Sequence, residues 1–313
     1  LLIDSVPTTC VAFSVDGKRL AVGSLDKSVR LWDLESNQEA VALGGNENTA
    51  MDIAFGPDGR QLALASLDGT VRVWDSSPAT TGHRAVPLQG HSGAVFGVAF
   101  QPAGAGPDGR RLLASASQDE TVRLWDATTG EQVRTLAGHA GPVSRVFFSR
   151  DGRRMVSADF AGVAKVWDTA TFKEVRTFRA FAGIAALSPD GRHIAFTAEG
   201  ALVHVRDAGT GEEILPPFRA HDVPIVTVAF SPDGKHLATG SWDGTVKVWE
   251  ASTGRAVRTY AGDDIIAGVA FSADGRRLAA ASWNKTATVW DTGTGKLLHT
   301  LRGHGHRVVG VAF

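Results

Sequence analysis

The stretch that decides the fold is Leu112–Asp126, LLASASQDETVRLWD, because the rest of the chain repeats it or joins two copies of it. Polar and apolar residues alternate over Thr121–Trp125, as they do in a strand with one buried face. The apolar run that ends at Ser117 predicts a second strand, joined to the first by a tight turn. Further strands are predicted at 95–100 and 132–136, so each repeat should hold four short antiparallel strands.

A Trp-Asp pair, or a close variant of it, ends the third predicted strand of every repeat. It occurs at Trp32-Asp33, Trp74-Asp75, Trp125-Asp126, Trp167-Asp168, Arg206-Asp207, Trp249-Glu250 and Trp290-Asp291. The successive steps are 42, 51, 42, 39, 43 and 41 residues. A repeat of this length, with Gly-His ahead of it and Trp-Asp at its end, resembles the WD40 family. The resemblance covers essentially the whole chain and implies an all-β fold, a seven-bladed β-propeller of four-stranded antiparallel blades.

We expect one domain over residues 1–313, because a single repeat cannot bury both faces of its sheet. Its units end near Asp33, Asp75, Asp126, Asp168, Asp207, Glu250 and Asp291. The apolar segment 308–313 repeats the first strand of a unit. It either closes the ring against the first unit or begins a further unit. Since the chain starts at Leu1 and not at Met, we expect a piece of a longer, bacterial-type WD40 protein.

Composition narrows the classes of partner. The chain has 32 Lys and Arg against 33 Asp and Glu, which gives no electrostatic reason to expect nucleic acid or an anionic membrane as a partner. Its single cysteine excludes an intrachain disulfide and suits a reducing compartment, so we predict a cytoplasmic location. It contains no run of 18 apolar residues, and we expect no membrane segment and a monomeric propeller.

The WD40 resemblance implies a buried relay in each blade: the Gly-His histidine, a hydroxyl on the second strand, a carboxylate before the third strand, and the Trp. The relay maps onto His91, Ser115, Asp119 and Trp125 in the third unit, and onto His221, Thr239, Asp243 and Trp249 in the sixth. His, Asp and Ser together also suggest a hydrolase triad. A set that recurs beneath packed strands is better explained as structural, because a buried imidazole needs a partner for each nitrogen. We therefore predict no catalytic residues and no enzyme activity.

Other units depart from the relay pattern. The histidine position holds Asp4, Asn46, Phe181 and Asp263 in units one, two, five and seven. Unit four has Ala161 at the carboxylate position, and unit seven has Asn284 there. Unit five is the shortest, has Arg206 in place of Trp and shows no clear carboxylate near Glu199-Gly200. We predict it to be the least regular blade.

No cofactor or metal is predicted. Gly293-Thr294-Gly295-Lys296 resembles the end of a phosphate loop but lacks the first Gly and the closing Ser/Thr of that motif. His304 and His306 have a spacing that a metal could use, but no third ligand accompanies them.

Two tryptophans stand at turn tips that in this family face the narrow end of the central channel. They are Trp242 and Trp283, each directly before the relay carboxylate position, and Leu25, Leu67, Gln118, Phe160 and Glu199 hold the equivalent place. A second rim position is Phe96 in unit three and Met51 in unit two. Apolar turn tips are unexpected unless something covers them, and aromatic residues commonly anchor interfaces. We predict a partner-binding rim made of Trp242, Trp283, Phe96, Met51, Leu67 and Leu25; the alternative is that these side chains fold onto neighbouring blades.

These features favour a non-enzymatic scaffold that binds a protein or peptide segment on its narrow, Gly-His face. The alternative function is a sensory or autoinhibitory module of a larger signalling protein, such as a kinase or a nucleotide-driven switch.

Overall fold

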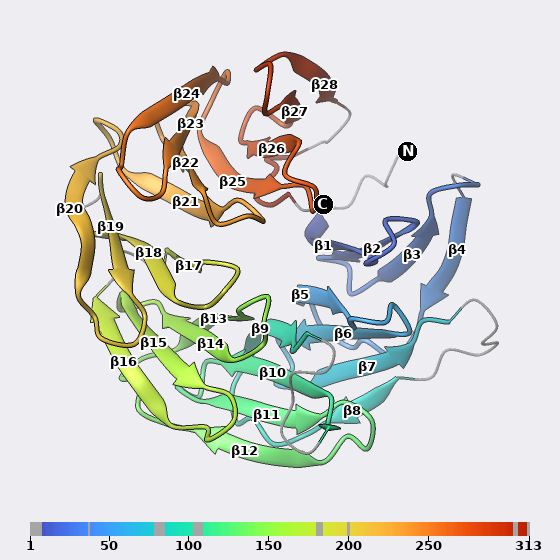
Figure 1. The fold of residues 1–313 in the computed structure, drawn as a ribbon. Coiled ribbons are helices and arrows are strands. Elements are labelled where there is room, and N and C mark those ends of the chain that lie inside the picture. The colour runs from blue at the N-terminus through green and yellow to red at the C-terminus, as the bar shows by residue number, and fades with distance from the viewer. Residues whose placement is uncertain are drawn as a thin grey trace. The chain divides into compact units, whose positions relative to one another are not determined.

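The computed structural model describes residues 8–36, 38–77, 85–102, 109–179, 184–198, 201–302 and 306–311. These residues form seven four-stranded antiparallel sheets, and the strands of every sheet follow chain order (Figure 1). The predicted fold class is confirmed: all-β, with the seven four-stranded antiparallel blades of a β-propeller.

Each blade takes one strand from each of four sets. The first strands are β1 (Thr8–Phe13), β5 (Ala50–Phe55), β9 (Val95–Phe100), β13 (Val143–Phe148), β17 (Ala185–Leu187), β21 (Ile225–Phe230) and β25 (Ile266–Phe271). The second strands are β2 (Arg19–Ser24), β6 (Gln61–Ser66), β10 (Leu112–Ser117), β14 (Arg154–Asp159), β18 (His193–Ala198), β22 (His236–Ser241) and β26 (Arg277–Ser282). The third strands are β3 (Val29–Asp33), β7 (Val71–Asp75), β11 (Val122–Asp126), β15 (Val163–Asp168), β19 (Leu202–Asp207), β23 (Thr245–Glu250) and β27 (Ala287–Asp291). The fourth strands are β4 (Gln38–Leu43), β8 (Val86–Leu88), β12 (Gln132–Leu136), β16 (Glu174–Arg179), β20 (Glu213–Arg219), β24 (Ala256–Ala261) and β28 (Leu297–Leu301).

The turn between first and second strands is built by a short polar motif, seen clearly in blade six. The hydroxyl of Ser231 donates to the Asp233 carboxylate at 2.6 Å and accepts the backbone N–H of His236 at 2.9 Å. Gly234 follows with φ of 72°, a left-handed conformation that glycine adopts without steric cost. The Asp-Gly pairs that predicted these turns therefore act through both the carboxylate and the missing Cβ.

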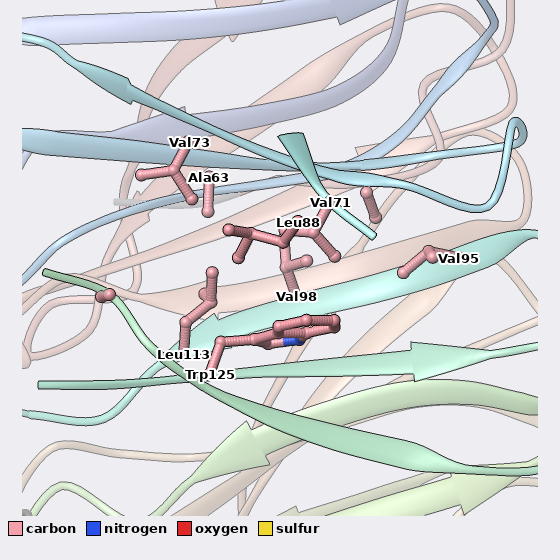
Figure 2. Packing of buried hydrophobic residues seen from close by; sticks show 10 residues of the cluster. Ala63, Val71, Val73, Leu88, Val95, Val98, Leu113 and Trp125 are labelled. Atoms are coloured by element: carbon pink, nitrogen blue, oxygen red, sulfur yellow. The ribbon is translucent and has the colours of Figure 1, made fainter. Parts of the chain in front are cut away.

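The core lies between successive blades. The chain divides into two compact halves, one ending at Glu174 and the other starting at Val175. In the first half, Val73 and Leu88 of blade two pack with Val98, Leu113 and Trp125 of blade three, all of them buried (Figure 2). Equivalent clusters in the second half centre on Trp249 and Trp290. In these three clusters, the Trp at the end of the third strand is thus the largest side chain packed against the preceding blade.

The described part of the segment predicted as a spare strand, residues 308–311, is not assigned to a strand. It nevertheless lies against β25, because the Val308 N–H donates to the Ser282 carbonyl at 3.1 Å and a Cβ on Gly268 would lie 3.2 Å from the Gly310 Cα. A Cβ on Gly97 of β9 would meet Arg145 of β13 in the same way, at 3.3 Å. Relative to β25, the segment therefore occupies the place of a following first strand. The predictions of a closing strand or a further unit, and of one domain over 1–313, stay predictions.

Candidate functional site

The relay residues of blade three lie in one hydrogen-bonded row. His91 Nδ1 lies 2.8 Å from Asp119 Oδ2, and His91 Nε2 lies 2.7 Å from Ser115 Oγ. The Trp125 indole N–H donates to the same Ser115 oxygen at 2.8 Å. The hydroxyl thus stands between the imidazole and the indole and serves both.

Blade six repeats this arrangement with threonine as the hydroxyl residue. His221 lies 2.8 Å from Asp243 and 2.8 Å from Thr239 Oγ1, and the Trp249 indole N–H donates to Thr239 at 3.0 Å. The second strand places the hydroxyl opposite the third strand, since Thr239 pairs with Lys247, two residues before Trp249. The spacing in the sequence therefore suffices to bring the Trp and the hydroxyl together.

The electrostatics of the relay favour a neutral imidazole. Burial lowers the pKa of His91, and the neighbouring Asp119 carboxylate offsets this only in part. Burial alone would raise the pKa of Asp119, but hydrogen bonds from Thr121 and His91 outweigh it and lower that pKa to about 2. A neutral imidazole donates from Nδ1 to the carboxylate and accepts the hydroxyl proton at Nε2, so every polar atom in the row has a partner.

Blade four holds a relay that differs from the sequence assignment. The prediction that Ala161 leaves the relay of blade four without a carboxylate is wrong, because Asp159 supplies the carboxylate. Asp159 lies at the end of β14, two residues before Ala161, and its Oδ2 lies 2.7 Å from His139 Nδ1. Ser157 completes the row at 2.7 Å from His139 Nε2, and Trp167 donates to it at 2.8 Å. A carboxylate on the strand thus replaces one in the turn.

Blade five holds Phe196 at the relay hydroxyl position, because Phe196 pairs with His204, two residues before Arg206, as Thr239 pairs with Lys247 in blade six. Thr197 is fully buried, and its hydroxyl has no hydrogen-bond partner among the residues that the structure describes. Arg206, which replaces the Trp, turns toward Glu213 and lies over the Phe196 ring, 5.7 Å from its centroid. His204 stacks on the same ring at 5.2 Å. The blade therefore fills the relay space with an aromatic and a cation, which fits the prediction that it is the least regular.

Some of the other residues that replace relay members in the sequence are described by the structure, and others are not. Asn46 does not replace a relay histidine, since its Nδ2 donates to the backbone carbonyls of Lys27 and Asn48. Asn284 accepts from Thr286 within its own turn. Asp4, Phe181, Glu199-Gly200 and His304 lie outside the described residues.

The relay geometry does not allow catalysis at the relay hydroxyls. Ser115, Ser157 and Thr239 are all fully buried, and each oxygen already contacts an imidazole and an indole. A nucleophile must reach a substrate carbonyl or phosphoryl group, which a packed sheet interior excludes. The triad-like set instead joins the second strand to the third strand and to the turn ahead of the first.

The two predicted tryptophans of the second half differ in exposure. The Trp242 side chain is 53% exposed at the tip of the β22–β23 turn, and its backbone is fixed by a hydrogen bond to Pro224 O at 3.1 Å. Trp283 holds the same place in the β26–β27 turn but is only partly exposed, because the Arg307 guanidinium lies over its ring at 4.0 Å from the centroid. Trp242 is therefore the more exposed of the two turn-tip tryptophans.

Four of the predicted rim residues belong to the first half. Leu25 and Leu67 are exposed at their turn tips, whereas Met51 packs onto the core cluster between blades two and three. Phe96 is partly buried and meets Phe160 edge to face, with ring centroids 5.5 Å apart. Phe160 is itself 62% exposed. The predicted rim does not include Phe160, although the sequence places it at an equivalent turn tip.

The first strands carry two partly buried groups, Asp52 and Cys10, that the sequence analysis did not single out. Burial raises the pKa of Asp52 to about 6, although its oxygens accept the N–H groups of Val98 at 3.0 Å and of Ile53 at 2.9 Å. Burial, and then the Asp52 charge, raise the pKa of the Cys10 thiol to about 12. An isolated Asp or Cys in an apolar strand is the signal that could have found them.

Within the part of the chain that the structure describes, no helix is long and apolar enough to cross a membrane. The same residues contain no group of three or more His, Cys, Asp or Glu side chains placed to share a metal ion.

The architecture of repeated four-stranded blades with His-Asp-hydroxyl-Trp relays defines the class of protein. The WD40 family model, described as "WD domain, G-beta repeat", matches residues 4–33, 38–75, 82–126, 130–168, 212–250 and 254–291. The chain therefore belongs to the WD40 family. Propellers of this family generally mediate protein interactions. The six matched segments leave out 169–211, which contains most of blade five.

Among curated proteins, the chain is similar to nuclear distribution protein PAC1 of several fungi. The protein from Coccidioides posadasii is 40% identical over 153 residues, which is 48% of this chain and 32% of the relative. Those from Gibberella zeae and Arthroderma otae are 33% and 32% identical, over 46% and 47% of this chain and 32% of each relative. The chain thus aligns with about a third of the length of these relatives.

Proposed function

We propose that this chain is a non-enzymatic platform that binds a protein or peptide segment through apolar side chains on the turns between second and third strands. Trp242 offers such a side chain in the second half, and Leu25, Leu67 and Phe160 do so in the first. The fully buried hydroxyls of Ser115, Ser157 and Thr239 support the absence of catalysis at the three triad-like sets in the described part of the chain.

The observation that carries the proposal is the Trp242 indole. Its backbone is held on both sides, since Trp242 N donates to Pro224 O at 3.1 Å and Gly244 N donates to Ser241 O at 3.2 Å. The side chain is therefore presented by a fixed turn and loses little entropy when a partner covers it. Burying about 100 Å² of its apolar surface would contribute about 2.5 kcal/mol to binding.

The test begins with peptides selected on the intact chain from a displayed library. For the tightest of them, Trp242→Ala should weaken binding by at least about tenfold, as loss of an aromatic anchor does. Val257→Ala is the matched control, because Val257 is 46% exposed on the outer strand β24 of the same half. Both variants should melt at nearly the wild-type temperature. Equal binding by Trp242→Ala and wild type would show that the turn tips are not the docking surface.

The other predicted rim residues have a second role beside binding. Trp283, Phe96 and Met51 each pack on a neighbour, so we expect their replacement by alanine to lower stability as well as binding. Docking on the Gly-His face, a monomeric state and a cytoplasmic location are parts of the same proposal, the last resting on the single cysteine. The role of a sensory or autoinhibitory module stays the alternative prediction.

A further inference from the structure

A cavity of about 810 Å³ lies in the first half, at the strand ends opposite the turn tips. One wall is formed by β8 and by the turn that follows β11. The residues of that wall are Val86, Leu88, Asp126, Thr128, Thr129 and Gly130. The cavity thus sits at the junction of blades two and three and shares no residue with the proposed turn-tip surface.

At two other junctions an arginine fills this place. In blade six, the Arg258 guanidinium donates to the Thr294 carbonyl at 2.7 Å and to the Gly293 carbonyl at 3.2 Å, both in the β27–β28 turn of the next blade. In blade four, Arg176 donates to the Gly209 carbonyl at 3.0 and 3.3 Å in the turn after β19. An arginine of the outer strand therefore closes each of these junctions.

The strand register identifies the matching residue in blade two. Arg258 pairs with Val248, the residue before the Trp of its blade. Val86 pairs with Val73, which stands directly before Trp74. Val86 thus holds the register position of the arginine, but the shorter valine side chain carries no guanidinium to donate to the facing turn.

The facing turns confirm the equivalence of the two junctions. A Cβ on Gly295 would collide with the Arg258 guanidinium, and a Cβ on Gly130 would lie 3.6 Å from Val86 Cγ1. Both glycines have a left-handed backbone conformation, with φ of 78° and 77°. Each donates its N–H to the backbone carbonyl of the Asp at the start of its turn, at 2.8 Å. The turns therefore share one conformation, and their carbonyls point the same way.

The acceptors left at blade three are the carbonyls of Thr128 and Thr129. They correspond to Gly293 and Thr294, which accept the arginine in blade seven. Among the described residues, no hydrogen bond reaches either threonine carbonyl. The cavity thus keeps two acceptors at the spacing that a guanidinium fork requires.

A carboxylate adds charge to the same wall. Asp126 is only 8% exposed, and its Oδ1 accepts the N–H groups of Thr128 and Thr129 at 2.8 and 3.1 Å. Its Oδ2 has no partner in the described part of the chain. In blade four the equivalent oxygen pairs with Arg154 at 2.9 Å, but the register position of Arg154 is held by Leu112 in blade three. The full lining of the cavity also contains Arg19 and Arg60 beside the carboxylates Asp16, Asp58 and Asp75. Because Asp126 has no cation of its own among the described residues, it favours a cationic ligand.

We propose that this cavity is a binding site for an arginine side chain of a partner peptide. The guanidinium would donate to the Thr128 and Thr129 carbonyls and to Asp126, and the aliphatic stem would pack on Val86 and Leu88. Lysine fits less well, because its single ammonium cannot bridge adjacent carbonyls and a carboxylate as a planar fork does. The cavity also exceeds the volume of one side chain several-fold, which leaves room for the flanking peptide backbone.

Ligand-observed NMR titration of the intact chain tests the proposal with acetyl-Ala-Arg-Ala-amide as probe. The matched lysine peptide should bind at least about fivefold more weakly, as loss of one charge-assisted hydrogen bond predicts. Free arginine should also bind more weakly than the peptide. No binding of the arginine peptide at about 10 mM, or equal binding of the lysine peptide, would overturn the site. Free arginine that binds as tightly as the peptide would overturn the assignment to a peptide.

Two variants separate the site from general effects on folding. Val86→Arg restores the arginine of the other junctions and should weaken probe binding at least about tenfold without lowering the melting temperature. If that variant does not fold, Asp126→Asn serves, because its amide oxygen can still accept the two threonine N–H groups while the charge is lost. Unchanged binding by a folded variant of either kind would refute the proposal.

Discussion

The sharpest prediction uses the same substitution at two buried threonines of second strands, Thr239→Val in blade six and Thr197→Val in blade five. Both threonines are fully buried on the second strand, and valine has nearly the same shape. In blade six the hydroxyl contacts His221 Nε2 at 2.8 Å and accepts from Trp249 at 3.0 Å. In blade five the hydroxyl has no partner among the described residues. The two variants therefore differ in hydrogen bonding and hardly in volume.

The expected effects have opposite sign. Thr239→Val leaves an imidazole nitrogen and an indole N–H unsatisfied in the interior, at a cost of about 1 to 3 kcal/mol each, so the free energy of unfolding should fall by about 3 kcal/mol. Thr197→Val removes a buried hydroxyl that gains nothing in the folded state, so stability should stay unchanged or rise by about 1 kcal/mol.

Urea unfolding followed by tryptophan fluorescence measures both values, and the slopes of the transitions should match the wild type. Equal destabilisation by the two variants would refute the reasoning, because it would assign the cost to packing and not to the lost partners. A Thr197→Val variant less stable by about 2 kcal/mol would show that its hydroxyl is satisfied.

Three further predictions concern single residues. Asp159→Ala should lower the free energy of unfolding by about 2 to 4 kcal/mol, because it strands the buried Nδ1–H of His139, and urea titration measures this. Because the pKa of Asp52 is raised to about 6, the folded chain holds a proton that the unfolded chain releases, and the stability from this group falls as pH rises from about 4 to 6. Asp52→Gly should therefore gain up to about 3 kcal/mol relative to wild type between pH 4 and 7, and parallel pH profiles would contradict this. Gly254→Ala should lower the stability measured by thermal unfolding by at least about 1 kcal/mol more than Gly275→Ala. Both glycines have a left-handed backbone conformation, but a Cβ would lie 2.9 Å from a ring carbon at Gly254 and 3.7 Å from the nearest atom at Gly275.

The sequence predicted the blades because their signals are local. Alternating strands, Asp-Gly turns and the Trp-Asp ends each depend on residues close in the chain, and their repetition made every strand set visible. The relays of blades three and six could be assigned for the same reason, since in both a hydroxyl ten residues before the Trp pairs with the residue two before it, on the same face of the sheet.

Features that depend on side-chain direction could not be predicted. Asp159 replaces the missing carboxylate of blade four from two residues earlier, and nothing in the spacing shows that its side chain reaches His139. Trp283 is covered by Arg307, whose position depends on the packing of the segment after β28. Sequence equivalence therefore identified turn-tip positions, whereas exposure distinguished Trp242 from Trp283.

The raised pKa of Cys10 makes the chain report on its own motions. A pKa of about 12 in place of 9 leaves about a thousandfold less thiolate at neutral pH, and alkylating reagents react with the thiolate. Because Cys10 is the sole cysteine, its alkylation rate in the native chain, compared with that in the unfolded chain, would report on openings of β1 with no added label.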